Sequence, residues 1–275
     1  MKRRAAAGYT ILEVMIVMAV TGAMFLSVSL MLSGKQAETQ FTQAVRDYES
    51  KIQSVSAEVR NGYYQSGTFN CSATDIAGTK VNISALPVAE AGTNKGCVFL
   101  GKVMTMGKTS ADIFTVAGRQ FIGASNSGDV KDLGQAVPKA VARAGYDVTE
   151  QYEYKYGLEV KNVYLIGTPP LTSVGGFGFM IELGGGAGSG NPVTGSRGVL
   201  LYRLAGPTAP NTNVRTLNAD AIDAAGSLIA APEGIRICLW DGGNRRAEIT
   251  VGANASQSET FVTIGSGIST ECQNA

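Results

Sequence analysis

A long apolar stretch near the N-terminus constrains this chain more than any other feature of its sequence. Residues 14–32 contain no Asp, Glu, Lys or Arg, and three basic residues, Lys2, Arg3 and Arg4, precede them. A helix of about 20 residues, rising about 1.5 Å per residue, crosses a hydrocarbon layer of about 30 Å. We therefore predict a transmembrane helix over about residues 11–32, with its basic end in the cytoplasm and the following chain on the other side.

The helical pattern continues beyond this stretch. An apolar residue recurs every three or four positions, at Phe41, Val45, Tyr48, Ile52, Val55 and Val59. This spacing forms one apolar stripe on a helix, and Asp47 and Lys51 are spaced for an i,i+4 ion pair. Asn61 and Gly62 then supply a stop signal. We predict one helix within residues 9–62, and a sheet of the same chain is a better partner for its stripe than a coiled coil.

The rest of the chain, residues 63–275, reads as a β-rich head domain. The chain has 35 Gly and only 8 Pro, which favours turns and strands over a helical bundle. The predicted strands are Cys97–Thr105, Asp112–Gly118, Gln151–Ile166 with an interruption at Gly157, Gly176–Leu183, Gly198–Leu204, Ile235–Trp240, Ala247–Val251 and Thr260–Ile264. The predicted fold class is therefore α+β, a long helix followed by an antiparallel β-rich domain.

Local patterns add detail to the head. From Tyr152 to Lys161 apolar residues fall on even positions and charges on odd ones, which is typical of a half-buried strand. The tyrosines of this row suit core or edge packing better than an adhesive patch. The run Asp241–Asn244 lies between two strands and predicts a hairpin turn. Segments 123–144 and 206–232 have weak periodicity, so we expect loops with one short helix each.

Four cysteines lie at positions 71, 97, 238 and 272, and none is part of a C-x-x-C pair. This spacing argues against a zinc site, and an even number outside the cytoplasm favours disulfides. Three pairings are formally allowed. We prefer Cys71 with Cys97 and Cys238 with Cys272 because the members of each pair are nearest in sequence, while buried free thiols remain the alternative.

Composition narrows the classes of function. The chain has no histidine, which removes the commonest general base and the commonest zinc ligand. Its net charge is +1 and the excess positive charge is concentrated at the N-terminus, so the overall balance does not indicate nucleic-acid binding. No Asp or Glu pair lies in a catalytic motif. We therefore expect no catalytic residues, no metal site and no cofactor.

Glu13 is a carboxylate inside the apolar stretch that begins at Tyr9. Two interpretations are open. If Glu13 lies within the hydrocarbon layer, its charge is unfavourable there and marks a functional site; if it lies at the level of the lipid headgroups, its charge costs little free energy. The residues around Glu13 form a specific order. A basic tip is followed by Gly8, by the aromatic Tyr9, by three further residues and Glu13, and then by a long apolar helix. This combination, which covers residues 1 to about 60, resembles the N-terminus of type IV prepilins and pseudopilins.

The resemblance implies roles for three residues. Prepilin peptidase would cut after Gly8, removing the leader 1–8, and Tyr9 would become the N-methylated mature N-terminus. Glu13 would then meet the free N-terminal amine of a neighbouring subunit during assembly. The implied partners are other pilin subunits, the peptidase, an inner-membrane assembly platform and the membrane. The implied fold is pilin-like, with the apolar half of the helix in the membrane or filament core.

The implied function is that of a structural subunit of a type IV pilus, a type II secretion pseudopilus or a DNA-uptake filament. The chain is long for a major pilin, which favours a minor pilin or pseudopilin. Its precursor would be a single-pass membrane protein that later reaches the cell surface. Two alternatives from other classes are an adhesin that uses a pilin anchor and a membrane-tethered enzyme. For the N-terminal segment, the rivals are a secretory signal peptide, whose apolar region should be shorter, and a plain membrane anchor.

Overall fold

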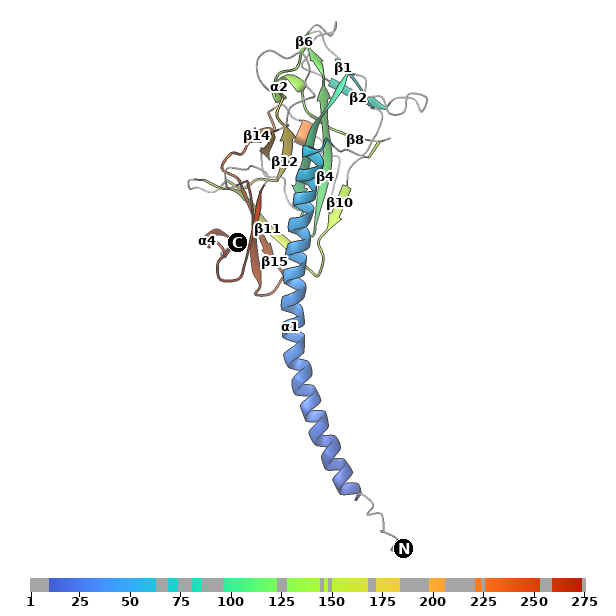
Figure 1. Cartoon of the computed structure of the whole chain (residues 1–275), viewed down its shortest axis with the longest axis vertical. Helices are drawn as coiled ribbons and strands as arrows, with labels where there is room; N and C mark the ends of the chain where they lie inside the picture. Colours follow the sequence, from blue (N-terminus) through green and yellow to red (C-terminus); the bar gives the residue numbers. More distant parts are fainter. Residues whose placement is uncertain are drawn as a thin grey trace.

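The predicted helix is continuous in the structure. Helix α1 (Ile11–Arg60) begins after Thr10 and ends at Asn61, and the next residue, Gly62, has a φ of 66°. The structure is a computed structural model that describes residues 10–62, 69–73, 81–85, 96–122, 128–143, 146–147, 150–167, 172–183, 198–205, 221–223, 226–252 and 259–273. Figure 1 shows the N-terminal half of α1 as a stem and its C-terminal half beside the strands of the head.

The larger sheet of the described part has seven antiparallel strands. In spatial order these are β10 (Glu150–Glu153), β4 (Ser110–Arg119), β3 (Cys97–Met106), β12 (Gly176–Ile181), β13 (Val199–Leu204) and β14 (Leu228–Ala230), with β7 (Lys139–Ala140) also paired to β4. The strands predicted from the sequence in this sheet are confirmed to within two residues at most ends. Strands β7 and β14 are too short to have produced a periodic signal.

A second antiparallel sheet holds four strands, β11 (Glu159–Leu165), β15 (Ile235–Trp240), β16 (Arg246–Val251) and β17 (Thr260–Ile264), in that order. The predicted hairpin turn joins β15 to β16. There the Asp241 side chain accepts hydrogen bonds from the backbone N–H groups of Gly243, at 2.8 Å, and Arg245, at 3.2 Å. An Asp that binds the backbone two residues onward in this way is a common turn former.

Several short elements complete the described head. Three small pairs are β1 (Phe69–Ala73) with β2 (Val81–Ala85), β5 (Phe121–Ile122) with β6 (Gly128–Asp129), and β8 (Ala142–Arg143) with β9 (Tyr146–Asp147). Helix α2 (Leu133–Ala136) lies in the segment where one short helix was expected, and helix α4 (Thr270–Gln273) lies near the C-terminus. The run GGGAGSGN over residues 184–191, whose composition favours a flexible loop, lies outside the described residues.

The main core lies between α1 and the two sheets. All six stripe residues predicted from the sequence are buried, and Tyr48, Ile52, Val55 and Val59 are fully buried. They belong to one apolar cluster with residues of both sheets, including Phe177 of β12 and Ile249 of β16. The apolar stripe of α1 therefore packs against both sheets and links them. This confirms the expectation that a sheet of the same chain covers the stripe.

The larger sheet is also buried on its other face. A second apolar cluster contains Val103 of β3, Phe114 of β4, Met180 of β12 and Ala136 of α2. Strands covered on both faces read as continuous apolar runs rather than as an alternation. This explains why β3, β4 and β12 contain long unbroken runs of buried residues.

The alternating segment from Tyr152 to Lys161 is not one strand. It is divided between β10 in the larger sheet and β11 in the smaller sheet, and the interruption predicted at Gly157 is where the chain turns. Tyr156 has a φ of 53° and its side chain is half exposed, so the expectation of packing fails for this tyrosine. Tyr152 and Tyr154 do pack against the main core, as expected.

Candidate functional site

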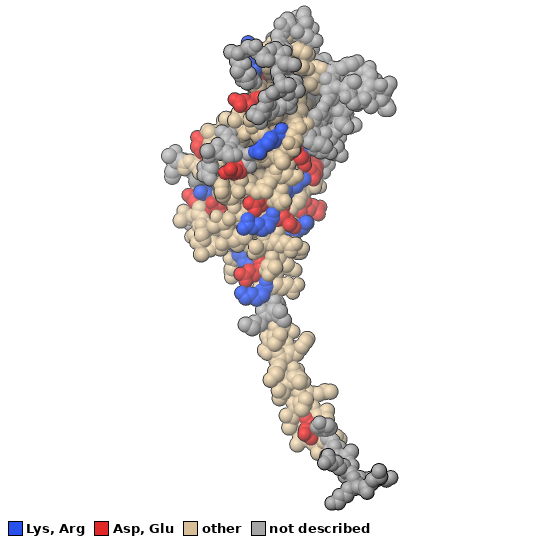
Figure 2. Space-filling model, viewed as in Figure 1, with Lys and Arg blue, Asp and Glu red and all other residues tan. Residues whose placement is uncertain are grey.

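The apolar half of α1 projects from the head without protein contacts. Every side chain of residues 11–29, which we call the stem, is exposed, and the exposed fraction of the larger apolar side chains runs from 45 % at Val14 to 82 % at Ile11. Figure 2 shows the stem as an almost uncharged rod below a head that carries both signs of charge. By length and composition this helix can cross a membrane. Apolar surface on this scale requires lipid or protein to cover it.

Glu13 lies in the first turn of α1. Its backbone N–H donates to the Thr10 side chain at 3.3 Å and to the Thr10 carbonyl at 3.1 Å. Thr followed three residues later by Glu is the capping-box pattern, a signal for the helix start that the prepilin resemblance did not use. Glu13 is also the only charged residue between Thr10 and Gly34. The proposed processing residues, Gly8 and Tyr9, lie outside the described residues.

The helix meets the head through an aromatic cluster centred on Tyr48. Its ring stacks with Tyr152 at a centroid distance of 5.9 Å and tilts against Tyr154 at 4.8 Å. The Tyr48 hydroxyl donates to the Met106 sulfur of β3 at 2.7 Å. Burial raises the pKa of Tyr48 and of Tyr154 well above the usual value of 10.0, so both stay neutral. This cluster fixes the turn between β10 and β11 on the helix.

Ion pairs to the head flank the buried stripe. Asp47 pairs with Lys155 at 3.1 Å, and Lys51 pairs with Glu150 at 2.5 Å. The expected i,i+4 pair between Asp47 and Lys51 is therefore wrong. An exposed pair within a helix contributes only a few tenths of a kcal/mol, so partners from the packed head displace it readily. The hydrogen bond that Lys155 donates to Asp47 raises the pKa of Lys155.

A more deeply buried pair joins Lys102 of β3 to Glu58 of α1. The Lys102 side chain is 9 % exposed and the Glu58 side chain 24 % exposed. Two charges this far from water are favourable only together, because each alone would be left desolvated. Glu58 lies in the last turn of α1, so this pair ties that turn to the larger sheet.

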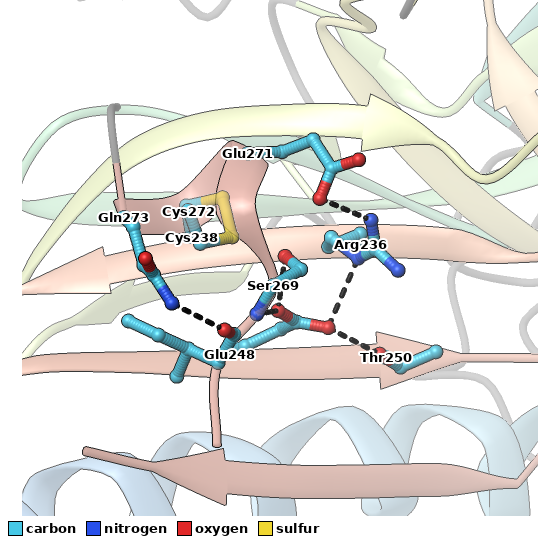
Figure 3. The surroundings of a disulfide bond; sticks show 9 residues. Arg236, Cys238, Glu248, Thr250, Ser269, Glu271, Cys272 and Gln273 are labelled. Carbon is cyan, nitrogen blue, oxygen red and sulfur yellow. Dashed lines mark hydrogen bonds and ion pairs between the residues drawn. A yellow bond between two sulfur atoms is a disulfide. The ribbon is translucent and has the colours of Figure 1, made fainter. Parts of the chain in front are cut away.

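The C-terminal segment is fastened across the outer face of the smaller sheet (Figure 3). Cys272 of α4 forms a disulfide with Cys238 of β15, one of the two pairings that we preferred. Beside it, Glu248 accepts a hydrogen bond from the Ser269 backbone at 2.9 Å and lies 2.9 Å from Arg236, which also pairs with Glu271 at 3.1 Å. A hydrogen bond from its own backbone lowers the pKa of Glu271.

The other cysteine pair is only partly described. Cys97 is disulfide-bonded, so the alternative of a free thiol is wrong for this residue. The Cys71 side chain lies outside the described side chains, and its pairing with Cys97 stays a prediction. Within the described ranges, no three His, Cys, Asp or Glu side chains gather as metal ligands would.

No protein-family model, no curated protein and no solved structure matches this chain.

Proposed function

We propose that this chain is a structural subunit of a filament of the type IV pilin or pseudopilin kind. It is made as a membrane-anchored precursor, cut by prepilin peptidase after Gly8, methylated at Tyr9 and inserted into the filament by an inner-membrane assembly platform. The observation that carries this proposal is the division of α1. One continuous helix has an exposed apolar stem and a second half whose apolar stripe is buried in the head.

The stem requires two successive environments in this function. In the precursor, lipid covers it, and in the filament, the stems of neighbouring subunits replace the lipid. A helix that is apolar on all sides suits both environments, because neither needs a polar face. The head needs no rearrangement in this transfer, because its core is formed with the second half of the same helix.

Glu13 sets the position of each subunit in the stem bundle. An isolated carboxylate and an isolated ammonium are each unfavourable in apolar surroundings, and together they neutralise one another. The partner of Glu13 is the amine of Tyr9 in a neighbouring subunit, released by cleavage after Gly8. A subunit inserted at the wrong height leaves both charges unpaired, so the pair selects one axial register.

The Glu13 contribution can be separated from helix capping by two substitutions. Glu13→Gln keeps a side chain that a capping box accepts and removes the charge, whereas Glu13→Ala removes both. We expect cleavage after Gly8 to persist in both variants and incorporation into filaments to fall by at least about tenfold in both, because one unpaired buried charge costs more than about 1.4 kcal/mol.

Incorporation is measured as the ratio of sheared filament fraction to membrane fraction by immunoblotting. Glu13→Asp is the matched control, because it keeps the charge on a side chain shortened by one methylene, and it should retain more incorporation than Glu13→Gln. Normal incorporation of Glu13→Gln would show that the charge has no role in assembly.

A further inference from the structure

Strand β17 lies at the outer edge of the smaller sheet, and its ladder to β16 is fixed at both ends. The Gly252 N–H donates to the Glu259 carbonyl at 2.8 Å, and the Gly265 N–H donates to the Arg246 carbonyl at 3.1 Å. In an antiparallel ladder, directly opposed residues alternate between pairs that exchange hydrogen bonds and pairs that do not. These two bonds therefore determine which residues of β17 bond to β16.

By this alternation Phe261 and Thr263 direct their backbone groups to β16. The backbone N–H and C=O groups of Thr260, Val262 and Ile264 point the other way. Over the described residues, none of these outward groups has a hydrogen-bond partner. Three successive pairs of free donors and acceptors form a template on which another strand can be added.

Two other edges of the sheets differ from that of β17. Strand β10 places Glu150 and Glu153 at its edge, both exposed. The outer side of β11 is already bonded, because the Leu165 N–H donates to the Thr172 carbonyl at 2.9 Å. Strand β17 contains no charged residue and no proline, and its Phe261 side chain is 45 % exposed. Natural sheets rarely leave such an edge free unless it has a partner.

Strands β10 and β17 lie on opposite flanks of α1 at the same height. Lys51 donates to Glu150 of β10 at 2.5 Å, and Gln53 donates to Thr260 of β17 at 2.7 Å. At about 100° per residue, two positions on the helix separate these side chains by about 200°. The helix therefore stands between two free edges, one acidic and one uncharged.

Both edge strands run in the direction opposite to α1. Strand β3 is opposed to the helix, because Lys102 meets Glu58 and the later residue Met106 meets Tyr48. Strand β10 is separated from β3 by two antiparallel steps, through β4, and so has the same direction as β3.

The smaller sheet begins at the same end of the head as the β3–β4 turn, where the Val160 N–H of β11 donates to the Lys108 carbonyl at 2.9 Å. From there β11 follows the direction of α1. Three antiparallel steps, through β15 and β16, lead to β17, which therefore runs opposite to the helix as β10 does.

We propose that β17 pairs, as a parallel strand, with the β10 edge of a neighbouring copy of this chain. The inference rests on the proposed filament, in which the stems of neighbouring copies lie side by side and point the same way. In that arrangement β17 of one copy and β10 of the next have the same direction and similar heights. The contact uses a different surface on each partner, so it leaves a free β17 and a free β10 at the two ends and repeats along a filament.

Disulfide cross-linking between two populations of the full chain tests this pairing. One population carries Phe261→Cys and the other Gln151→Cys, and both are produced together in cells that assemble the filament. No cysteine is free among those the structure describes, so each version offers one new thiol. Both positions point away from α1 on their strands, and in the proposed pairing they come to the same face of the joined sheet.

We expect a cross-linked dimer only when both populations are present. If the neighbours are offset by two strand residues, Phe261→Cys should cross-link to Glu153→Cys in place of Gln151→Cys. A dimer formed by Phe261→Cys alone would show an antiparallel contact of β17 with itself and would overturn the proposal. A Val20→Cys population mixed with a Met24→Cys population reports separately on packing of the stems, because the contact of Glu13 with the Tyr9 amine offsets neighbouring stems by about four residues. Stem cross-links without the β17–β10 dimer would refute the edge pairing and leave the filament standing, and absence of both would refute both.

Removing one edge donor gives an independent readout. Val262→Pro lacks the central outward N–H and keeps every bond to β16, a position where sheets tolerate proline. Val262→Ala is the matched control, because it also loses side-chain volume but keeps the N–H. In the Phe261→Cys background we expect Val262→Pro to lower the yield of cross-linked dimer at least about fivefold, and Val262→Ala to leave it within about twofold. Equal yields would contradict a backbone-mediated contact.

Discussion

Removing the disulfide between Cys238 and Cys272 should destabilise the head by an amount set by the loop that it closes. The two residues are 34 positions apart, and the chain-entropy relation for a loop of that length gives about 3.8 kcal/mol at 25 °C. Both side chains are almost fully buried, and replacement by Ala keeps apolar side chains at both positions. In a domain of this size, that loss corresponds to a decrease in Tm of roughly 8–15 °C.

The double variant Cys238→Ala/Cys272→Ala is compared with the native chain by thermal and urea unfolding in detergent. A reducing agent is a poor substitute, because it also breaks the disulfide of Cys97. An unchanged urea dependence of the free energy would show that the variant unfolds from the same structure. A loss of less than about 1 kcal/mol would refute the loop-closure reasoning and would assign the anchoring of the C-terminal segment to the Ser269–Glu248 hydrogen bonds and the Arg236–Glu271 ion pair.

Three further changes test the joint between helix and head. Tyr48→Ala should destabilise the chain by about 3–5 kcal/mol in urea unfolding, because it empties a fully buried aromatic site. Burial raises the pKa of Tyr48, so its contribution is full below pH 10.0 and is lost as the pH rises, when the unfolded phenol ionises. Tyr48→Phe should therefore flatten the loss of stability above that pH, and an unchanged slope would contradict this origin. Glu58→Ala should cost about 2–3 kcal/mol by leaving the Lys102 charge unpaired, and Glu58→Gln nearly as much, because it also removes the charge; a much smaller loss for Glu58→Gln would argue against a charge effect.

The spacing of apolar residues was sufficient to predict the helix and strands whose surroundings are the same along their whole length. The helix stripe from Phe41 to Val59 meets one continuous core, so its spacing of three and four residues identified both the helix and its buried face. Strands β15, β16 and β17 were equally predictable, because one face of each contributes side chains to the main core.

Periodicity failed where tertiary contacts decide the outcome. The alternation from Tyr152 to Lys161 satisfies the strand pattern, yet the chain leaves one sheet at Tyr154 and enters the other at Glu159. Sequence spacing also paired Asp47 with Lys51, although both find partners in the head. Local patterns cannot report such contacts, because the partners are about a hundred residues away in the chain.

The free edge of β17 was also beyond sequence reasoning. Its residues predict a strand, and nothing in them tells whether the strand lies in the middle of a sheet or at its border. Only the strand order and the ladder register show that Thr260, Val262 and Ile264 have backbone groups without partners in the described part of the chain.

Mass spectrometry of the mature N-terminus tests the proposed processing and anchoring most directly. The proposed function requires a chain that begins at Tyr9 with a methylated amine, because only cleavage after Gly8 releases the amine that Glu13 is to meet. A chain that begins near Lys35 would mean that the stem is a removed signal peptide. An intact Met1 would mean a plain membrane anchor, and either result would contradict the filament subunit.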